Sequence, residues 1–492
     1  MPKYIFDNAN ADTKDQAIWR QINSARDSDF DTNSAFAELL DNSTAANSED
    51  GSITTKNIYI NFSSKSVGTG RAYKQMVDQA VFIDDGVGMD KDILATCLQW
   101  AQSTRYNDRR GIGRFGVGMT YAAIFQSKKC EVFSKTKEGS WNYVAFDMTG
   151  DPVKDPAPFI TDPKKKVPPK EVLKGCETLT NGTIVILSDF DKISEDFETV
   201  VDEFKYYVAR TFRHFIWGST TRFDNILNNI NFFINGEQIK AIDPLYLTTA
   251  ATAHPDDPTA DAWDIQTIDV PIDKNPSLQT SVEIRMSLLP KEWRKRKAQS
   301  RTPEDKQKET SRYVDKNLGI SIIRKGREVS NFVPDHYWKK GGGFTSDNKG
   351  YSYAMNRWWG CEISFSPDCD KLFEVRNIKR GAKPVKDLRT EINNIITPII
   401  IQMSEQIVDW WIECTPVKPK DDDPKPIEDI IKDDPVKDNP QNDPEEEIEE
   451  RFKTKPYLVV FEDWKGDDFA EFKHPKKGLT LRYNTRHILN QK

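Results

Sequence analysis

One stretch near the end of this chain cannot belong to a folded core. Residues 415–450 contain 14 acidic residues, five lysines and seven prolines, which gives a local net charge of −9. Such a segment has too little apolar surface to offset the entropy lost on folding, so it predicts a solvated linker. The chain must therefore fold as a long part before it and a short part after it. Because the whole chain has a net charge of −7, the remainder carries about +2.

The composition of the chain limits the classes of protein to which it can belong. It has 492 residues, of which 37% are hydrophobic and 30% charged, a balance that indicates a globular protein with room for two or three domains. The sequence contains no run of about 18 apolar residues, so it predicts no membrane span. The start, MPKYIFDNAN, shows no secretory signal. The six cysteines are scattered without a CxxC pair. We therefore expect reduced thiols in a cytoplasmic protein, and no zinc site.

The order of predicted elements indicates an α+β fold. Helical patterns cover 34–47, 90–100 and 195–216, and a Gly-rich loop enters another helix over 111–125. Strands are predicted at 57–62, 79–85, 129–135, 141–148 and 182–190, and Asn235–Gly236 is a hairpin signal. Helices that follow strands in this way predict a layer of helices on a mixed sheet.

The first candidate site residues lie on the helix predicted over 34–47. Glu38 and Asn42 are four residues apart and therefore share one helix face. A carboxylate can orient or deprotonate a water molecule, and an amide oxygen is a good ligand for a hard cation. The alternative is an ordinary amphipathic helix with a polar stripe.

Two glycine-rich segments follow. In FIDDGVGMD a strand ends at Asp84 and is followed by Gly86 and Gly88, which suits recognition of an amino group on a planar base; a simple tight turn is the alternative. In GIGRFGVG, four glycines precede an apolar helix and could bind an anion through bare amides. This segment is neither a Walker A loop nor a dinucleotide-binding turn, and a flexible capped loop remains the alternative.

Together, ELLDN, DDGVGM, GRFGVG and NGTIVIL resemble the four ordered motifs of the GHKL ATPase superfamily. That superfamily includes DNA gyrase B, MutL, the large heat-shock chaperones, sensor histidine kinases and the Microrchidia (MORC) proteins. The resemblance covers roughly residues 30–240. It implies a Bergerat ATP-binding sandwich, with helices on a mixed sheet, and it implies ATP and Mg²⁺ as cofactors.

The resemblance also implies roles for individual residues. Glu38 would be the general base for the hydrolytic water, Asn42 would bind the magnesium ion, and Asp84 would accept a hydrogen bond from the adenine amino group. Asp41, turned by about 100° from Asn42, would only brace the site. The remaining nucleotide contacts would come from Gly86, Gly88, Met89 and Thr183 around the base and from Gly113, Arg114, Phe115, Gly116, Val117 and Gly118 around the phosphates. Residues 91–112 would form a mobile lid, in which Arg105, Arg109 and Arg110 either attract triphosphate or are solvated.

The region after residue 245 resembles the S5-like α/β transducer domain that follows the ATPase domain in gyrase, MutL, chaperone and MORC-like proteins. The resemblance rests on the hairpin NLGISIIRKGREV, on RWWGCEISFSPDCDKLFEVRNIKRGAKP, and on a helix of about 30 residues after it. It implies that Lys379 in VRNIKR reaches the terminal phosphate, with Arg380 or Arg376 as substitutes. The segment departs from the MORC-like pattern at Ile378 and at Arg380, where a glutamine is usual. A plain surface lysine is the alternative.

Other features of this region have simpler interpretations. We expect Trp358 and Trp359 in a core. Residues 291–316 hold ten basic and five acidic residues and either contact nucleic-acid phosphates or form a solvated helix.

These features predict five segments: an N-terminal arm (1–30), a GHKL ATPase domain (31–245), a transducer-like domain (246–415), the linker (416–450) and a small C-terminal module (451–492). The function that the resemblance implies is an ATP-gated, dimerising clamp of MORC-like type. It would act on DNA, with partner effector proteins, in antiviral defence, and away from membranes. The alternative is a chaperone-like ATPase that acts on protein clients. A histidine kinase fits poorly, because the first histidine, His214, follows the nucleotide motifs. Gyrase and MutL fit poorly because no cleavage or endonuclease domain follows.

Overall fold

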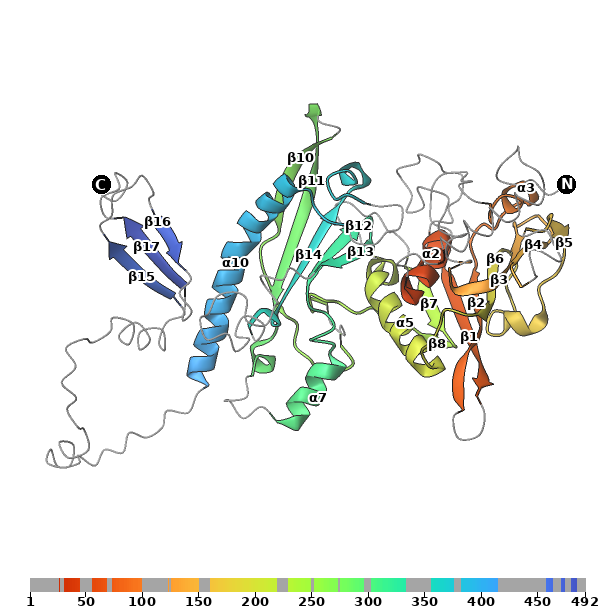
Figure 1. The fold of residues 1–492 in the computed structure, drawn as a ribbon, viewed down its shortest axis with the longest axis horizontal. Helices are drawn as coiled ribbons and strands as arrows, with labels where there is room; N and C mark the ends of the chain where they lie inside the picture. The colour runs from red at the N-terminus through yellow and green to blue at the C-terminus, as the bar shows by residue number, and fades with distance from the viewer. Residues whose placement is uncertain are drawn as a thin grey trace.

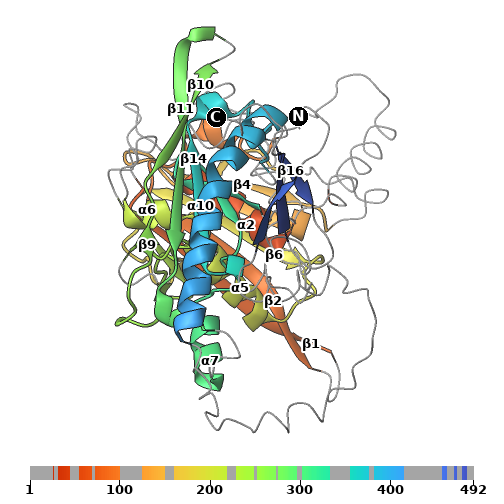
Figure 2. The same ribbon diagram turned by 90° about the vertical axis from the view of Figure 1, so that its left-hand side faces the viewer.

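The computed structural model contains two parts, each with helices and a sheet, that lie next to each other, and a third, smaller sheet (Figures 1 and 2). It describes residues 26, 31–44, 55–68, 73–99, 123, 125–149, 160–218, 229–248, 252–272, 275–295, 302–332, 355–375, 382–414, 457–462, 470–473 and 479–484. Within these residues the α+β fold predicted from the sequence is confirmed. No described helix has the length and apolar character that crossing a membrane requires.

The first part is built on an eight-stranded sheet with the order β5-β4-β3-β6-β2-β1-β7-β8. Neighbouring strands are antiparallel except β1 and β7, which are parallel, so the sheet is mixed. The strands are β1 (Asn57–Val67), β2 (Lys74–Asp84), β3 (Ser127–Lys135), β4 (Asn142–Asp147), β5 (Lys164–Lys165), β6 (Gly182–Phe190), β7 (Asn231–Ile234) and β8 (Glu237–Gln238). The predicted hairpin at Asn235–Gly236 is confirmed as the β7–β8 turn.

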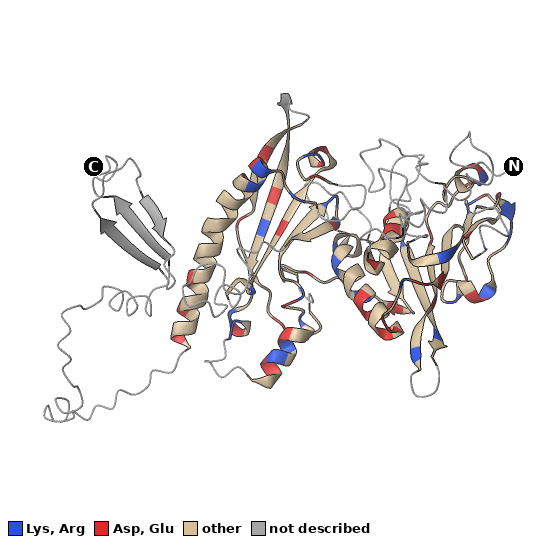
Figure 3. Cartoon of the chain, viewed as in Figure 1, with Lys and Arg blue, Asp and Glu red and all other residues tan. Residues whose placement is uncertain are grey.

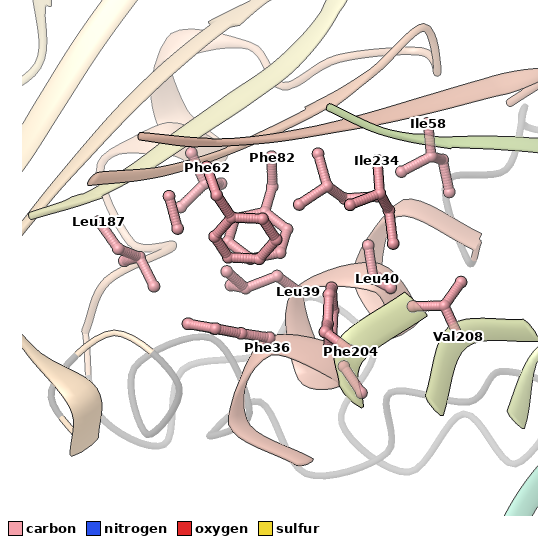
Figure 4. Close-up of a cluster of buried hydrophobic side chains, with 14 of the residues drawn as sticks. Phe36, Leu39, Leu40, Ile58, Phe62, Phe82, Leu187, Phe204, Val208 and Ile234 are labelled. Atoms are coloured by element: carbon pink, nitrogen blue, oxygen red, sulfur yellow. The ribbon is translucent and has the colours of Figure 1, made fainter. Parts of the chain in front are cut away.

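Both faces of this sheet are apolar and covered. Along β2, Ala80 and Phe82 face the main core, whereas Val81 and Ile83 face a second, smaller cluster. The main core lies under helices α2 (Thr32–Thr44) and α5 (Phe197–Thr211), and Figure 4 shows its aromatic centre. The smaller cluster includes Val172, which belongs to the short helix η1 (Lys170–Leu173).

Two predicted helices are shorter than expected. The helix predicted over 90–100 is α3 (Lys91–Leu94), because the next backbone bonds run only three residues back, as from Thr96 N to Ile93 O at 3.1 Å. The helix predicted over 195–216 breaks at Phe212, whose φ of −104° and ψ of 16° end α5 before α6 (Arg213–Trp217). A pattern of apolar residues continues through this break, which is why the sequence alone does not show it.

The second part is a six-stranded sheet backed by a long helix. Its strand order is β10-β11-β14-β12-β13, with β9 paired to β11. The elements are β9 (Asp261–Ala262), β10 (Gln266–Ile272), β11 (Asn275–Leu288), η2 (Lys291–Trp293), α7 (Pro303–Ser311), β12 (Ile320–Arg324), β13 (Arg327–Phe332), β14 (Trp359–Phe365), η4 (Pro367–Cys369) and α10 (Lys386–Glu413). The hairpin predicted from NLGISIIRKGREV is confirmed as β12–β13.

Helix α10 covers one face of the second sheet. Its buried residues recur every three or four positions, from Leu388 through Ile392, Ile396 and Ile400 to Trp411, and they join the strands in one core. Trp358 and Trp359 are 1% and 2% exposed and belong to this core, as predicted.

The third sheet lies beyond the acidic stretch. It has the order β15-β17-β16, and its strands are β15 (Tyr457–Glu462), β16 (Ala470–Lys473) and β17 (Leu479–Asn484). The strand predicted in KPYLVVFEDW is therefore confirmed. The linker itself lies outside the described residues.

Candidate nucleotide-binding site

Helix α2 is fixed on the main core by its apolar face. The helix begins after Asp31, whose carboxylate accepts hydrogen bonds from the Ser34 backbone N at 2.7 Å and from its hydroxyl at 3.1 Å. Phe36, Leu39 and Leu40 face the strands (Figure 4), and the Phe36 ring lies 5.4 Å from the Phe82 ring. The helical repeat therefore turns residues 38, 41 and 42 away from the sheet.

The carboxylate of Asp84 lies at the end of β2, next to α2. One of its oxygens accepts a hydrogen bond from the Ser43 hydroxyl at 3.0 Å, and the other accepts one from the Gly86 backbone N at 3.0 Å. Asp84 is only 6% exposed. Because Ser43 belongs to the helix that carries Glu38 and Asn42, the first and second sequence motifs meet at this carboxylate.

The electrostatics of Asp84 fit a binding role. Burial raises its pKa to about 6, although the hydrogen bonds from Gly86 and Ser43 act in the opposite direction. A buried acid with a raised pKa at the end of a strand is typical of functional sites. At pH 7 such a carboxylate is largely ionised and is a strong acceptor for an amino group.

The neighbouring aspartate has a structural role instead. Asp85 accepts hydrogen bonds from the backbone N of Lys56 at 2.7 Å and of Asn57 at 3.0 Å, and from the Asn57 side-chain amide at 2.7 Å. These bonds fix the start of β1 against the end of β2. The two acids of the DDGVGM motif thus have separate tasks.

Close backbone packing surrounds Asp84. A Cβ atom on Gly88, whose φ is +72°, would lie 2.1 Å from the Lys135 carbonyl oxygen, and one on Gly182 would lie 2.0 Å from the Asp84 carbonyl oxygen. The Ser134 hydroxyl accepts a hydrogen bond from Met89 N at 2.8 Å and lies 2.9 Å from the Thr183 hydroxyl. The second and fourth motifs are therefore joined through β3.

The three polar residues at the centre of α2 differ in exposure. Glu38 and Asp41 are buried, at 6% and 0% exposed, whereas Asn42 is exposed. Asp41 forms an ion pair with Arg327 of β13, with Nε and Oδ1 2.6 Å apart. The sequence predicted that Asp41 braces the site, and the second sheet supplies the cation that holds it.

Several predicted residues lie outside the described part of the chain. They are Gly113, Arg114, Phe115, Gly116, Val117 and Gly118 of the third motif, Arg105, Arg109 and Arg110 of the lid, and Arg376, Lys379 and Arg380 of the transducer loop. Their roles stay predictions.

The residues present fit a magnesium ion held mainly by its nucleotide. Asn42 offers one exposed amide oxygen, and the described residues contain no cluster of three acidic, histidine or cysteine side chains that could hold a metal alone. Mg²⁺ usually keeps several waters and uses one or two protein ligands plus substrate phosphates, which suits a single amide here.

Sequence reasoning missed four residues that shape the site: Ser43, Ser134, Asn181 and Arg327. Ser43 had a local signal, because it directly follows ELLDN. The amide of Asn181 donates to the Gly86 carbonyl oxygen at 2.7 Å, and its place at the start of NGTIVIL is likewise local. Ser134 becomes a neighbour only through strand pairing, and Arg327 lies 286 residues from Asp41.

A comparison with known protein families found a match in the first domain. Residues 30–159 match the family model of histidine kinase-, DNA gyrase B-, and HSP90-like ATPases. The match supports membership of the GHKL superfamily for this part of the chain, and with it ATP binding and hydrolysis. It includes the first three motifs, while Thr183 lies beyond it. No curated protein matches the chain.

Proposed function

We propose that the chain is a magnesium-dependent ATPase whose nucleotide site lies between α2 and the ends of β2 and β6. One observation carries this proposal: the buried Asp84 carboxylate, which Ser43 of α2 and the Gly86 amide hold at 3.0 Å each. An ionised acid in this place can accept the adenine amino hydrogen, while Gly88 lets the loop after β2 pack closely against the Lys135 carbonyl of β3.

Two residues of α2 and one of the second domain then have tasks in hydrolysis. Asn42 would present its amide oxygen, and Mg²⁺, when bound there, would neutralise charge on the phosphates. Glu38 would take a proton from the water whose oxygen bonds to the γ-phosphorus, and the bond from that phosphorus to the ADP oxygen would break. Lys379 would reach the terminal phosphate as a point charge on a flexible side chain.

The further proposal is a MORC-like clamp that dimerises on ATP and acts on DNA, with a role in antiviral defence. Lys164 and Lys165 of the edge strand β5 are exposed, and Figure 3 shows basic residues at this end of the first sheet, where phosphates could contact them. The basic stretch 291–316 supports this less. Lys295 is paired with Asp305 at 3.2 Å, and the other described pairs there include Lys308–Glu304 and Arg312–Asp257.

The test is the Glu38→Ala variant of the full chain. We expect it to lose hydrolysis, to keep ATP binding, and to accumulate as a dimer with ATP, measured by phosphate release, nucleotide titration and sedimentation. Normal hydrolysis by this variant would exclude Glu38 as the base. DNA binding is then measured on the trapped state, with and without ATP, at several salt concentrations. A flat salt response would exclude a phosphate-contacting clamp and favour a chaperone-like ATPase.

A further inference from the structure

A buried ion pair connects helix α2 to the second sheet. Arg327 is the first residue of β13, and its side chain and that of Asp41 are 3% and 0% exposed. The Arg327 Nε lies 2.6 Å from Asp41 Oδ1, and its Nη1 donates to the Glu328 carbonyl oxygen at 3.0 Å. The guanidinium thus joins the helix that carries Glu38 to a strand from the other part of the molecule.

The charge around Arg327 involves both acids of α2. Burial alone would lower the pKa of Arg327, but Asp41, Tyr207 and Glu38 outweigh burial, and the pKa lies well above its usual value. The guanidinium also lies 5.7 Å from the centre of the Phe212 ring, where α5 ends. Arg327 is therefore a permanent positive charge in the neighbourhood of Glu38.

Separate ion pairs determine where β13 lies. Glu328, the next residue, accepts from Arg210 Nε at 3.0 Å and from Arg213 Nη1 at 2.6 Å. On β14, Glu362 accepts from Arg213 Nη2 at 2.5 Å and lies 3.3 Å from His214. All five side chains are buried, and Figure 1 shows α5 next to β13. The strand that carries Arg327 is thus fixed on α5 and α6 independently of α2.

We propose that Arg327 is a positioning residue of the ATPase site, through which the second domain sets the place and the charge environment of Glu38. This inference rests on the proposed function of Glu38 as general base. Glu38 and Asp41 are three residues apart, about 60° around the helix. A buried carboxylate without a cation is costly, so the pair with Arg327 of β13 helps to hold α2 in this place. Movement of the second domain would therefore displace the general base.

The experiment compares Arg327→Met with a matched control in the same hairpin. Arg324 of β12 pairs with Asp370 at 2.6 and 2.9 Å, and both side chains are as buried as those of the Arg327 pair. Arg324 lies opposite Arg327 in the hairpin, so Arg324→Met removes a similarly buried ion pair next to Arg327 while leaving the Arg327–Asp41 pair in place. Arg327→Lys keeps the charge but not the planar fork.

In the full chain, Arg327→Met should lower kcat about tenfold or more and change the KM for ATP by less than about threefold. Arg327→Lys should recover part of kcat, and Arg324→Met should leave kcat near the wild-type value. If Arg327→Met does not fold, Asp41→Leu combined with Arg327→Met replaces the pair by apolar groups and should restore folding. Its kcat should stay low, and a normal kcat would overturn the proposal.

Hydrogen exchange of the α2 amides without nucleotide gives a readout that does not need activity. Exchange should be faster in Arg327→Met and unchanged in Arg324→Met. Wild-type exchange together with wild-type kcat in Arg327→Met would reduce Arg327 to an ordinary core contact. If the wild-type chain hydrolyses no ATP, the proposed function fails, while the exchange comparison still decides whether Arg327 holds α2.

Discussion

The two ends of the candidate site are held in different ways. The Asp84 end is built from strands β2, β3 and β6 of one sheet and from its covering helix α2, through side-chain hydrogen bonds and close backbone packing. The Glu38 end lies on the opposite side of α2, where a cation from the second sheet balances the buried Asp41. The proposed base recognition is therefore local to the first domain, whereas the proposed catalysis depends on the second.

This difference suggests an order of events. A site that can hold the base without the second domain can bind ATP first. In the proposed function, the second domain then decides, through Arg327 and Lys379, whether the bound nucleotide is hydrolysed. Variants at the Asp84 end should consequently change binding, and variants at the Asp41–Arg327 pair should change turnover.

The largest effect at the local end is expected from Gly88→Ala. The new Cβ would lie 2.1 Å from the Lys135 carbonyl oxygen, on a residue whose φ is +72°. Since backbone cannot yield as a side chain can, β3 and the loop after β2 must separate, and ATP binding should be lost in a nucleotide titration.

Gly175→Ala is the matched control. Gly175 also has a positive φ, +85°, but nothing lies within 4 Å of its Cβ position. The substitution should lower the free energy of unfolding by about 1 kcal/mol and leave ATP binding intact. Equal loss of binding in both variants would mean that backbone strain, and not the contact at Gly88, is responsible.

Asp84→Asn should have the next largest effect. The amide has the shape of the acid but lacks its charge, and hydrogen bonds to charged groups contribute about 1.5–3 kcal/mol, so affinity for ATP should fall on the order of fiftyfold. At saturating ATP, kcat should change little, because Glu38 is untouched. Retained affinity would exclude Asp84 from adenine recognition.

Asp85→Asn controls for loss of an acid at this turn. Its carboxylate accepts three hydrogen bonds from residues 56 and 57, so the variant should lower the melting temperature and leave affinity for ATP nearly unchanged. A fall in affinity equal to that of Asp84→Asn would mean that the two acids act as one structural unit.

The sequence predicted what depends on neighbours along the chain. The strand that ends at Asp84, the helix with Glu38 and Asn42, and the hairpin turns at Asn235–Gly236 and Lys325–Gly326 all follow from local patterns. Helix α2 is described up to Thr44, and residues 45–47 of the predicted helix lie outside the described residues.

What could not be predicted depends on contacts across the fold. Ser134 reaches Thr183 only because β3 and β6 pair, and Arg327 reaches Asp41 only because two separate sheets meet at α5 and α6. A buried acid such as Asp41 needs a partner, yet the sequence contains 70 lysines and arginines that could supply it. That a lysine or arginine would pair with Asp41 was therefore predictable, but the position of that residue in the sequence was not.

The smallest expected effect is the pH dependence of ATP binding, which distinguishes the Asp84 end of the site from the Glu38 end. Since burial raises the pKa of Asp84 to about 6, the ionised form that we propose accepts the adenine amino group is lost as the pH falls through this value. Affinity for ATP should be constant above pH 7 and about tenfold weaker at pH 5, in a calorimetric titration.

The contribution of Asp84 to the stability of the fold depends on pH in the opposite direction. It is full below pH 3.8 and is lost as the pH rises through about 6, because the folded state binds this proton more tightly. Asp84→Asn should remove both dependences, whereas Arg327→Met should leave them in place. An unchanged pH dependence of binding in Asp84→Asn would show that another group titrates, and the local account of base recognition would be wrong.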